Sequence, residues 1–306
     1  MRTVVAGLGI QGNKRAAIAG ADLVATVDPV NAKAQYKDIK QVALDSFDSV
    51  LVCTPDQAKF EIIEYLLNNR KHVLVEKPLL ADDNAPIQRM LEIATRNKTV
   101  CYTAYNHRFE PHIVNLKKLL DSGALGEIFE VKIFYGNGTA RDVKLSAWRD
   151  QGMGVLPDLG SHLLDMALFL FGEEALMERV FTPWSFDRFE NKSFDHVIFA
   201  SRGKPLFIFE ATLVSWRNSF YLDVWAEKGS AHIDCLCKWG PSTFTVRKRV
   251  LPSGRPSEES EVLKCADPTW AIEYDHFKAL CRNGEANLKN DLWINSSLNQ
   301  LSVEKE

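Results

Sequence analysis

The sequence lacks long apolar runs and carries no strong excess of either charge. Its longest candidate membrane span, residues 163–171, contains Asp165 and is far shorter than the roughly 20 apolar residues that cross a bilayer. The formal net charge is −3 over 306 residues, so neither nucleic acid nor a membrane surface is an expected partner. Met1 runs directly into an apolar strand rather than into a leader sequence. We therefore expect a soluble cytoplasmic protein.

The cysteines indicate neither a metal site nor a disulfide framework. Six are present. Cys235 and Cys237 are two positions apart, but no second pair at zinc-binding spacing accompanies them. Cys53 and Cys101 stand in apolar, strand-like runs, where cysteine behaves as a small hydrophobic residue. We expect reduced structural thiols and no metal ligands.

A glycine-rich turn near the start of the chain is its most informative feature. An apolar run at 2–6 precedes the turn and a helical stretch at 11–19 follows it. The turn consists of Gly7, Leu8, Gly9, Ile10, Gln11 and Gly12. In a dinucleotide-binding unit Gly7 makes the tight turn, Gly9 lets a pyrophosphate approach, and Gly12 lets helix and strand pack closely. The phosphates then meet the free N–H groups of the helix N-terminus. The alternative is a glycine-rich turn in an unrelated α/β protein.

An acid at the end of the second apolar run supports dinucleotide binding. The run at 22–27 ends at Asp28, 21 positions after Gly7, where such units carry an acid that binds the ribose diol. Pro29 follows it, rather than an arginine that could hold a 2′-phosphate. The sequence therefore predicts a bound dinucleotide and favours NAD over NADP.

The first hundred residues alternate apolar strands with helical stretches. Candidate strands are 2–6, 22–27, 48–53, 72–76 and 99–103, and candidate helices are 11–19, 31–37, 57–69 and 83–96. This alternation predicts a doubly wound parallel sheet with helices on both faces, which we assign to an NAD-binding Rossmann domain at 1–105. Right-handed crossovers place the carboxyl ends of the strands along one crevice. Thr54-Pro55 and Glu76-Lys77-Pro78 are therefore expected on the cofactor side.

From residue 106 the pattern changes, and we assign 106–306 to an α/β domain for substrate binding and oligomerisation. Candidate helices are 111–122, 159–171, 269–282 and 291–304, candidate strands are 128–135, 194–201, 205–214, 219–227, 230–237 and 242–250, and loops are expected at 136–157 and 252–261. Successive strands with hairpin turns at Gly203-Lys204 and Lys228-Gly229 predict an open, largely antiparallel sheet. Its apolar residues need a cover, so we expect a homo-oligomer, either dimer or tetramer.

Candidate chemistry begins at Glu76-Lys77-Pro78, after the apolar run 72–75. A lysine at this strand end faces the crevice where a nicotinamide would lie. Its ammonium can hydrogen-bond a substrate hydroxyl and favour loss of the hydroxyl proton. Pro78 fixes the turn and favours an extended backbone at Lys77. The alternative is a surface lysine at a strand end.

A second candidate set lies in the segment 154–165. Asp158 and His162 are four positions apart at the predicted start of a helix, so both can project from one face, and Asp165 lies on that side too. A histidine can take a hydroxyl proton as hydride leaves the same carbon, and a neighbouring carboxylate can orient it or bind another hydroxyl. The alternative makes Asp158 an N-cap and His162 a structural residue.

Together these elements resemble the Gfo/Idh/MocA oxidoreductases, a family that includes glucose–fructose oxidoreductase and inositol dehydrogenases. The order and spacing match from residue 1 to about residue 172, and the later part agrees in type only. The matching stretches are 7–12, Asp28, 48–55, 72–78, 106–109, Trp148-Arg149 and 154–165.

The resemblance implies a Rossmann domain joined to an α/β domain whose open sheet often forms subunit contacts. It also implies a lysine and a histidine that act on a sugar or cyclitol hydroxyl. Lys77 and His162 occupy those two positions, and Asp158 occupies the associated acid position. Residues that match positions near the nicotinamide and substrate are Asn106, Trp148 and Arg149.

The chain departs from the family at two points. The family often has a histidine five residues after the threonine of its Thr-Pro turn, where this sequence has Lys59, so the packing near the cofactor is expected to differ. The C-terminal part of the family is often longer, so the substrate domain is expected to be pared down.

The sequence thus predicts an NAD-dependent dehydrogenase acting on a secondary alcohol of a carbohydrate, with Lys77, Arg149, Asp158 and His162 at the substrate. A nucleotide-activated sugar is the first choice, a free sugar or inositol the second, and a sugar phosphate the third. The basic residues behind this order are Arg141, Lys144, Arg149 and Arg217, although surface solvation explains them as well. Two further classes stay open: an NAD-using glycosidase and a non-catalytic NAD-binding regulator.

Overall fold

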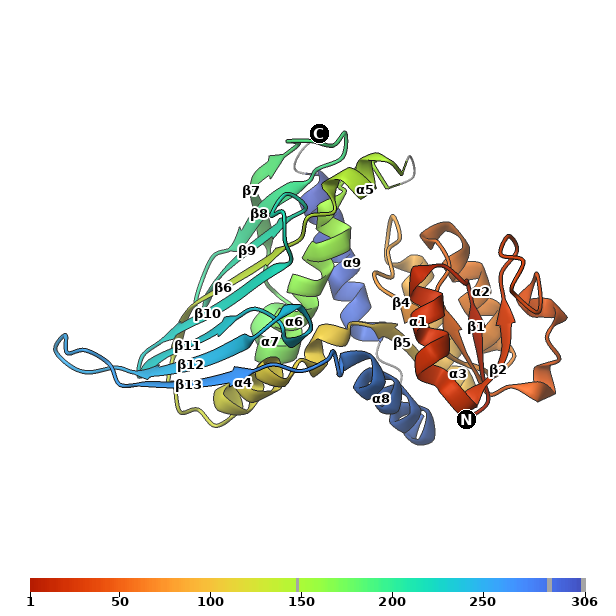
Figure 1. Cartoon of the computed structure of the whole chain (residues 1–306), viewed down its shortest axis with the longest axis horizontal. Coiled ribbons are helices and arrows are strands. Elements are labelled where there is room, and N and C mark those ends of the chain that lie inside the picture. The colour runs from red at the N-terminus through yellow and green to blue at the C-terminus, as the bar shows by residue number, and fades with distance from the viewer. Residues whose placement is uncertain (147–148, 285–287, 304–306) are drawn as a thin grey trace. The chain divides into compact units, whose positions relative to one another are not determined.

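The computed structural model describes residues 1–146, 149–284 and 288–303, which form two compact units (Figure 1). The first unit contains residues 1–106 together with 269–296, and the second contains the intervening segment and the C-terminal residues. Helix α8 (Thr269–Asn283) and the first part of α9 (Leu288–Val303) therefore belong with the N-terminal residues, although the sequence placed them in the second domain. Among the described residues, no helix is long and apolar enough to cross a membrane.

The first unit is built on a parallel sheet of five strands in the order β2-β1-β3-β4-β5. The strands are β1 (Thr3–Ala6), β2 (Leu23–Val27), β3 (Ser49–Val52), β4 (His72–Glu76) and β5 (Cys101–Ala104). This sheet confirms the predicted Rossmann fold. The direction of winding reverses between β1 and β3, so the carboxyl ends of these two strands mark the crevice where such sheets bind ligands.

Helices cover both faces of this sheet, because its strands carry apolar residues toward both. Val50 and Val73 pack against α2 and α3 on one face, and Leu51 and Leu74 pack toward α1 and α8 on the other. These helices are α1 (Ile10–Ala19), α2 (Asp56–Asn68), α3 (Ala85–Asn97) and α8. A strand that is buried on both faces reads as a continuous apolar run, which is why periodicity located it.

Residues 31–37, predicted as a helix, instead form a turn with one strand bridge at Tyr36. The N–H of Tyr36 donates to the carbonyl of Thr26 at 3.1 Å, and the N–H of Asp28 donates to the carbonyl of Tyr36 at 3.0 Å. The carboxylate of Asp28 accepts the N–H of Asn31 at 2.7 Å. These bonds occupy backbone groups that a helix would need, so local side-chain capping overrides the weak helical pattern.

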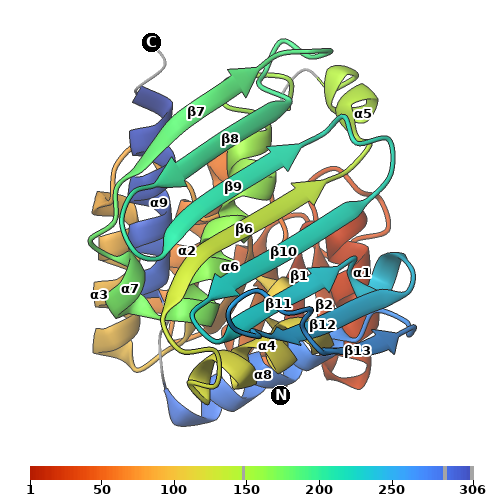
Figure 2. The ribbon, with the colours of Figure 1, turned by 90° about the vertical axis from the view of Figure 1, so that its left-hand side faces the viewer.

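The second unit is built on an eight-stranded sheet in the order β13-β12-β11-β10-β6-β9-β8-β7 (Figure 2). Within the described residues only the pair β6 and β9 is parallel, so the sheet is largely antiparallel, as predicted. The strands are β6 (Ile128–Gly136), β7 (Phe181–Asp187), β8 (His196–Ser201), β9 (Leu206–Thr212), β10 (Ser219–Ala226), β11 (Gly229–Asp234), β12 (Ser242–Lys248) and β13 (Glu258–Leu263). The helices that begin in this unit are α4 (Pro111–Asp121), α5 (Ala140–Lys144), α6 (Ser161–Phe171) and α7 (Glu173–Leu176).

Four elements of the second unit were not predicted, namely strands β7 and β13 and the short helices α5 and α7. Strand β13 lies within the expected loop 252–261 and beyond it, because cross-strand charge pairs rather than apolar alternation support it. The guanidinium of Arg247 donates to Glu258 at 2.7 Å across the pair. Strand β7 contains Pro183, and its pairing with β8 shifts register next to this residue. Proline has no N–H for the sheet, so it occurs in edge strands such as β7 or at bulges. The short helix α5 occupies part of the expected loop 136–157.

Candidate active site

The glycine-rich turn lies at the carboxyl end of β1 and packs tightly against the end of β3. Gly7 has a φ of +94°, and its N–H donates to the carbonyl of Val27 at 2.8 Å. A Cβ on Gly7 would lie 2.5 Å from the carbonyl oxygen of Cys53, and one on Gly12 would lie 1.7 Å from the carbonyl oxygen of Gly7. Both contacts are shorter than any real Cβ contact, so only glycine fits at these two positions.

The N-terminus of α1 has the properties of an anion-binding site. Gly9 is its N-cap residue, no side chain caps the helix, and no acid stands in its first turn. A Cβ built on Gly9 would have no atom within 4 Å, so the space beside the turn is open. Ile10 is 79% exposed. Helix N–H groups without a cap, next to open space, fit the pyrophosphate of a dinucleotide.

Asp28 lies at the end of β2 and binds the backbone of the glycine turn. Its Oδ2 accepts the N–H of Leu8 at 2.7 Å, and its Oδ1 accepts the N–H groups of Val30 at 2.9 Å and Asn31 at 2.7 Å. Burial favours the neutral acid, but these three N–H donors outweigh it and lower the pKa of Asp28. The carboxylate is therefore ionised and fixed beside the turn.

Two asparagines that the sequence did not single out also hold the turn. The amide of Asn13 donates to the carbonyls of Leu8 at 3.1 Å and Gly9 at 2.8 Å, and that of Asn31 donates to Leu8 at 3.0 Å. Both stand close in sequence to the recognised motif, which is the only signal that could have identified them. They hold the carbonyls of Leu8 and Gly9 in place.

A buried ion-pair network fixes the end of β4. The guanidinium of Arg15, which is 1% exposed, donates to Glu76 and lies against Glu273 of α8, with both distances 2.7 Å. Burial alone would lower the pKa of Arg15, but the two carboxylates raise it, so it stays charged. Glu76 is thus a partner of Arg15, directly before Lys77. The partner Glu273 lies too far along the sequence for spacing to have revealed it.

The remaining predicted cofactor residues of the first unit follow its strands. Thr54 and Pro55 come after β3, where Pro55 is the N-cap residue of α2. Asn106 follows β5, and its amide donates to the hydroxyl of Thr269 at 2.7 Å. The predicted cofactor residues of this unit therefore lie at the carboxyl ends of its five strands. They are Gly7, Gly9, Ile10, Gln11, Gly12, Asp28, Thr54, Pro55, Glu76, Lys77 and Asn106.

In the second unit His162 is the centre of a buried aromatic cluster. It lies in the first turn of α6 and its ring stacks on that of His107, with 4.2 Å between ring centroids and 30° between planes. Tyr135 of β6 packs against both rings. The Nζ of Lys238 lies 2.7 Å from Nε2 of His107. The sequence identified His162 but not the other three, which come from separate segments that only the folded chain brings together.

Asp158 lies in a π-helical turn, Leu156–Gly160, that leads into α6. The N-cap residue of α6 is Gly160, and that of the π turn is Val155, so the alternative that made Asp158 an N-cap is wrong. Oδ2 of Asp158 is 3.5 Å from the guanidinium of Arg149. The two predicted substrate residues Arg149 and Asp158 are therefore ion-paired. Trp148 lies outside the described residues.

Asp165 has a different role from its neighbours on α6. Its carboxylate is buried and forms a bidentate pair with Arg108, whose Nε donates to both oxygens at 2.8 and 3.0 Å. Arg108 belongs to a 3₁₀ turn, Asn106–Phe109, that also carries His107. The Arg108–Asp165 pair therefore attaches this turn to α6 and supports the stacking of His107 on His162.

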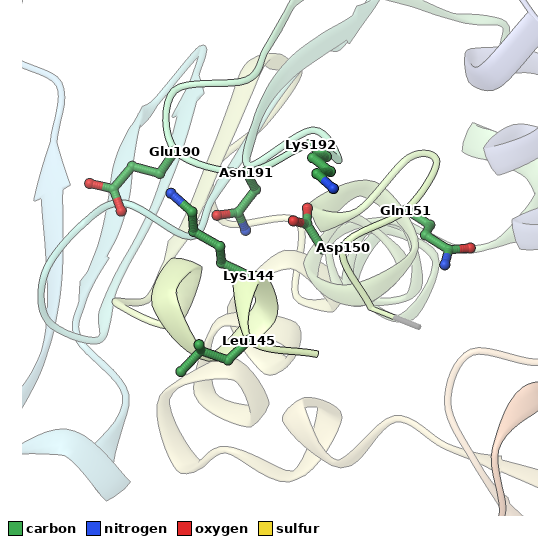
Figure 3. A pocket seen from close by; sticks show the side chains of 7 residues that line it. All are labelled: Lys144, Leu145, Asp150, Gln151, Glu190, Asn191 and Lys192. Carbon is green, nitrogen blue, oxygen red and sulfur yellow. The ribbon is translucent and has the colours of Figure 1, made fainter. Parts of the chain in front are cut away.

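A cavity of about 740 Å³ opens elsewhere in the second unit, between the β7–β8 connection and the segment after α5. Charged and amide side chains gather around it (Figure 3). Its lining residues are Lys144, Leu145, Asp150, Gln151, Glu190, Asn191 and Lys192. Lys144 is one of the basic residues weighed for the substrate, but neither Asp158 nor His162 lines this cavity.

Comparison with known proteins finds family models that match segments in both units. An oxidoreductase family model with an NAD-binding Rossmann fold matches residues 1–105, and a GFO/IDH/MocA C-terminal domain model matches residues 113–232. The myo-inositol 2-dehydrogenase of Thermotoga maritima is 32% identical over 154 residues, which are 49% of this chain and 43% of that protein. The chain spans about two-fifths of the length of the curated relatives that it matches.

Solved structures resemble the chain over nearly its whole length. A levoglucosan dehydrogenase in complex with NADH has a TM-score of 0.82 at 18% identity, covering 99% of this chain and 95% of that one. A UDP-N-acetylglucosamine 3-dehydrogenase from Acidithiobacillus ferrooxidans has a TM-score of 0.78 at 18% identity, covering 99% and 97%. At this identity the likeness establishes the fold.

Proposed function

Because the chain belongs to the Gfo/Idh/MocA oxidoreductase family, we propose that it is an NAD-dependent dehydrogenase acting on a secondary hydroxyl of a carbohydrate. The observation that carries this proposal is the cradle at the carboxyl ends of the strands. An uncapped helix N-terminus and an ionised Asp28 stand at the same sheet edge as Lys77. This edge offers donors for phosphates, an acceptor for a ribose and a cation for a reacting oxygen.

The residues of the first unit would hold the cofactor as follows. The first N–H groups of α1 bind the pyrophosphate, Asp28 binds the adenosine ribose, and Thr54, Pro55 and Asn106 border the remainder. A bound nicotinamide supplies the acceptor or donor of hydride. An ionised Asp28 accepts hydrogen bonds from a ribose diol but repels a 2′-phosphate, which supports NAD over NADP.

The protein then needs to handle one proton and one developing charge. His162 takes the proton of the substrate hydroxyl and returns it in the reverse reaction. Lys77 donates a hydrogen bond to the same oxygen and stabilises the alkoxide as it forms. Asp158, paired with Arg149, binds a neighbouring hydroxyl or orients His162. The stacked His107 fixes the plane of the His162 ring.

For the substrate we propose a nucleotide-activated sugar first, then a free sugar or inositol, and a sugar phosphate third. Arg149 is a cation beside Asp158, so the candidate substrate region of the second unit carries a group that can meet a phosphate. The named relatives act, according to their descriptions, on inositol, levoglucosan and UDP-N-acetylglucosamine. This range is consistent with a carbohydrate substrate and does not choose among the three.

We also propose that the chain forms a homo-oligomer through the uncovered face of its eight-stranded sheet. Helices α4 and α6 pack on one face, and within the described residues the other face carries no helix (Figure 2). Tyr221 and Trp225 of β10 are 41% and 46% exposed there. Large apolar side chains on an open face are typical of a surface that a second subunit covers.

The proposed activity is tested by a panel of sugars, inositols, sugar phosphates and nucleotide sugars with NAD, followed by the absorbance of reduced nicotinamide. We expect at least one compound to reduce NAD. Lys77→Met should lower kcat by about 10²-fold or more, while the dissociation constant of NADH stays unchanged. Lys40→Met, at a surface ion pair with Glu61, is the matched control and should keep full activity.

Other results would reject this function. Turnover that survives Lys77→Met removes the lysine from the chemistry. Net hydrolysis of a glycoside without accumulation of NADH indicates the glycosidase alternative. Failure of the whole panel, together with capture of one specific protein partner, indicates the regulator.

A further inference from the structure

Lys59 is a buried cation near the start of α2, and its side chain is 3% exposed. Its Nζ donates to the carbonyl oxygens of Glu76 at 2.8 Å and Pro78 at 3.0 Å. The same Nζ lies 2.6 Å from Oδ1 of Asp56. An ammonium has three N–H donors and no acceptor, so these three acceptors match its full capacity. A lysine is rarely buried unless it is paired in this way.

The two carbonyls that Lys59 binds flank Lys77. The register of β3 against β4 ends at the pair Val52 and Val75, so the carbonyl of Glu76 lies beyond the last registered backbone pair on that side. Lys59 reaches this carbonyl from α2, the helix that follows β3. It therefore supports β4 past the point where the pairing with β3 ends, while Glu76 is still paired with Ala104 of β5 on the other side.

The segment before Lys77 is also held through a side chain. The carboxylate of Glu76 binds the buried Arg15 at 2.7 Å, while its carbonyl binds Lys59. Main chain and side chain of Glu76 are thus fixed by two different cations. The Asp56 carboxylate compensates the charge of Lys59, so a cation can be kept at this buried position.

We propose that Lys59 is a positioning residue that fixes the backbone on both sides of Lys77 and so sets where the Lys77 ammonium stands. The proposal rests on the role of Lys77 in the proposed function. A misplacement of about 1 Å can cost roughly 10²-fold in rate. The histidine often found here in the family has at most two N–H donors. Lys59 supplies a third, and with it the pair to Asp56.

The test compares Lys59→Met, which removes all three donors, with Lys59→Gln, which keeps two N–H groups on a shorter side chain. The matched control is Lys71→Met, because Lys71 also donates to a carbonyl, that of Phe47 at 2.9 Å, next to the amino end of β4. We expect Lys59→Met to lower kcat by about 10- to 100-fold with an unchanged dissociation constant for NADH. Lys59→Gln should lower kcat by a smaller factor, and Lys71→Met should leave kcat unchanged.

A second readout does not depend on turnover. Trace acetylation of the folded protein, followed by mass spectrometry, measures the reactivity of the Lys77 amine relative to the exposed Lys228. We expect Lys59→Met to change this ratio and Lys71→Met to leave it unchanged. If wild type oxidises no sugar, the proposed function fails, yet the labelling still tests the positioning. The inference is overturned if the folded Lys59→Met variant has the kcat of wild type and the same labelling of Lys77. If Lys59→Met does not fold, the same result in Lys59→Gln overturns it.

Discussion

Asp28 holds the backbone around the glycine turn, and in the proposed function the same side chain also selects the cofactor. Its three backbone donors hold the glycine turn and the segment after β2 in place, and they keep the carboxylate ionised although burial opposes it. The depressed pKa means that this stabilisation is fully present above the unfolded value of about 3.9 and is lost as the pH falls through the lower folded value. At neutral pH the charge is therefore available to discriminate between cofactors.

Asp28→Asn should narrow the preference for NAD over NADP, because it removes the charge that repels a 2′-phosphate and keeps one acceptor oxygen for the backbone. We expect wild type to bind NADH more tightly than NADPH by about tenfold or more, which corresponds to about 1.4 kcal/mol, and the variant to lose most of this ratio. Fluorescence titration with both cofactors measures it. Asp48→Asn, another acid that binds a backbone N–H, is the control, and tighter NADPH binding by wild type would reject the assignment.

At the scale of elements, the sequence predicted what rests on local pattern. The parallel strands, the glycine turn and α6 follow from apolar runs and motif spacing. The prediction of a helix at 31–37 was wrong because hydrogen bonds to Asp28 fix that segment as a turn. The prediction of a loop at 252–261 was wrong because charge pairs such as Arg247–Glu258 support β13. The site shows the same division. Lys77 and His162 stand in recognisable motifs, but Lys59 and Lys238 gain their partners only through folding.

Strand β4 also carries a pH-sensitive group at its amino end. Nδ1 of His72 accepts the N–H of Val100 at 3.0 Å, and burial, aided by Lys71 and opposed by Asp48, lowers the pKa of His72. The folded state therefore binds this proton less readily than the unfolded state, so stability is full above the unfolded value of about 6.5 and falls as the pH drops from there toward the folded value.

This loss should appear when the free energy of unfolding is measured by denaturant titration between pH 5 and 8, a range of about one to two pH units around the unfolded pKa. The unfolding free energy of wild type should decrease below about pH 6.5, with at most about 1.4 kcal/mol per pH unit from this one proton. His72→Gln should flatten that part of the curve. An identical slope in wild type and His72→Gln would remove His72 from the pH response.

The uncovered sheet face matters at the scale of the whole molecule, because it decides whether one chain is the functional particle. On this sheet the rings of Phe134 in β6 and Tyr221 in β10 pack together, with 5.6 Å between their centroids. The rings of Trp225 and His232 do the same, with 5.1 Å between centroids. Trp225→Glu should place a charge in the proposed interface and give monomers by light scattering at micromolar concentration. Trp216→Glu, at a position that is 70% exposed outside the strands, should remain assembled, and a monomeric wild type would reject the interface.

The composition of the first unit leads to the last prediction. The sequence ends the Rossmann domain at residue 105, but Phe277 of α8 is fully buried on its sheet, and the Tyr274 hydroxyl bonds Thr3 at 3.0 Å and Asp22 at 3.1 Å. Removing α8 forfeits about 1.5–3 kcal/mol for the phenylalanine alone. It also takes Glu273 from the buried Arg15, at a cost of about 3–5 kcal/mol.

These losses together approach the 5–15 kcal/mol (roughly) that stabilises a whole domain, so we expect a chain of residues 1–105 to show no cooperative thermal transition. The amide of Asn106 and the hydroxyl of Thr269 are 2.7 Å apart, so a short Gly-Ser linker can join residue 106 directly to 269–296. This joined chain should unfold cooperatively, and NADH should raise its midpoint, because a ligand that binds only the folded state stabilises it. Circular dichroism with and without NADH distinguishes the two chains. Cooperative, NADH-sensitive unfolding of residues 1–105 alone would show instead that the domain ends where the sequence placed it.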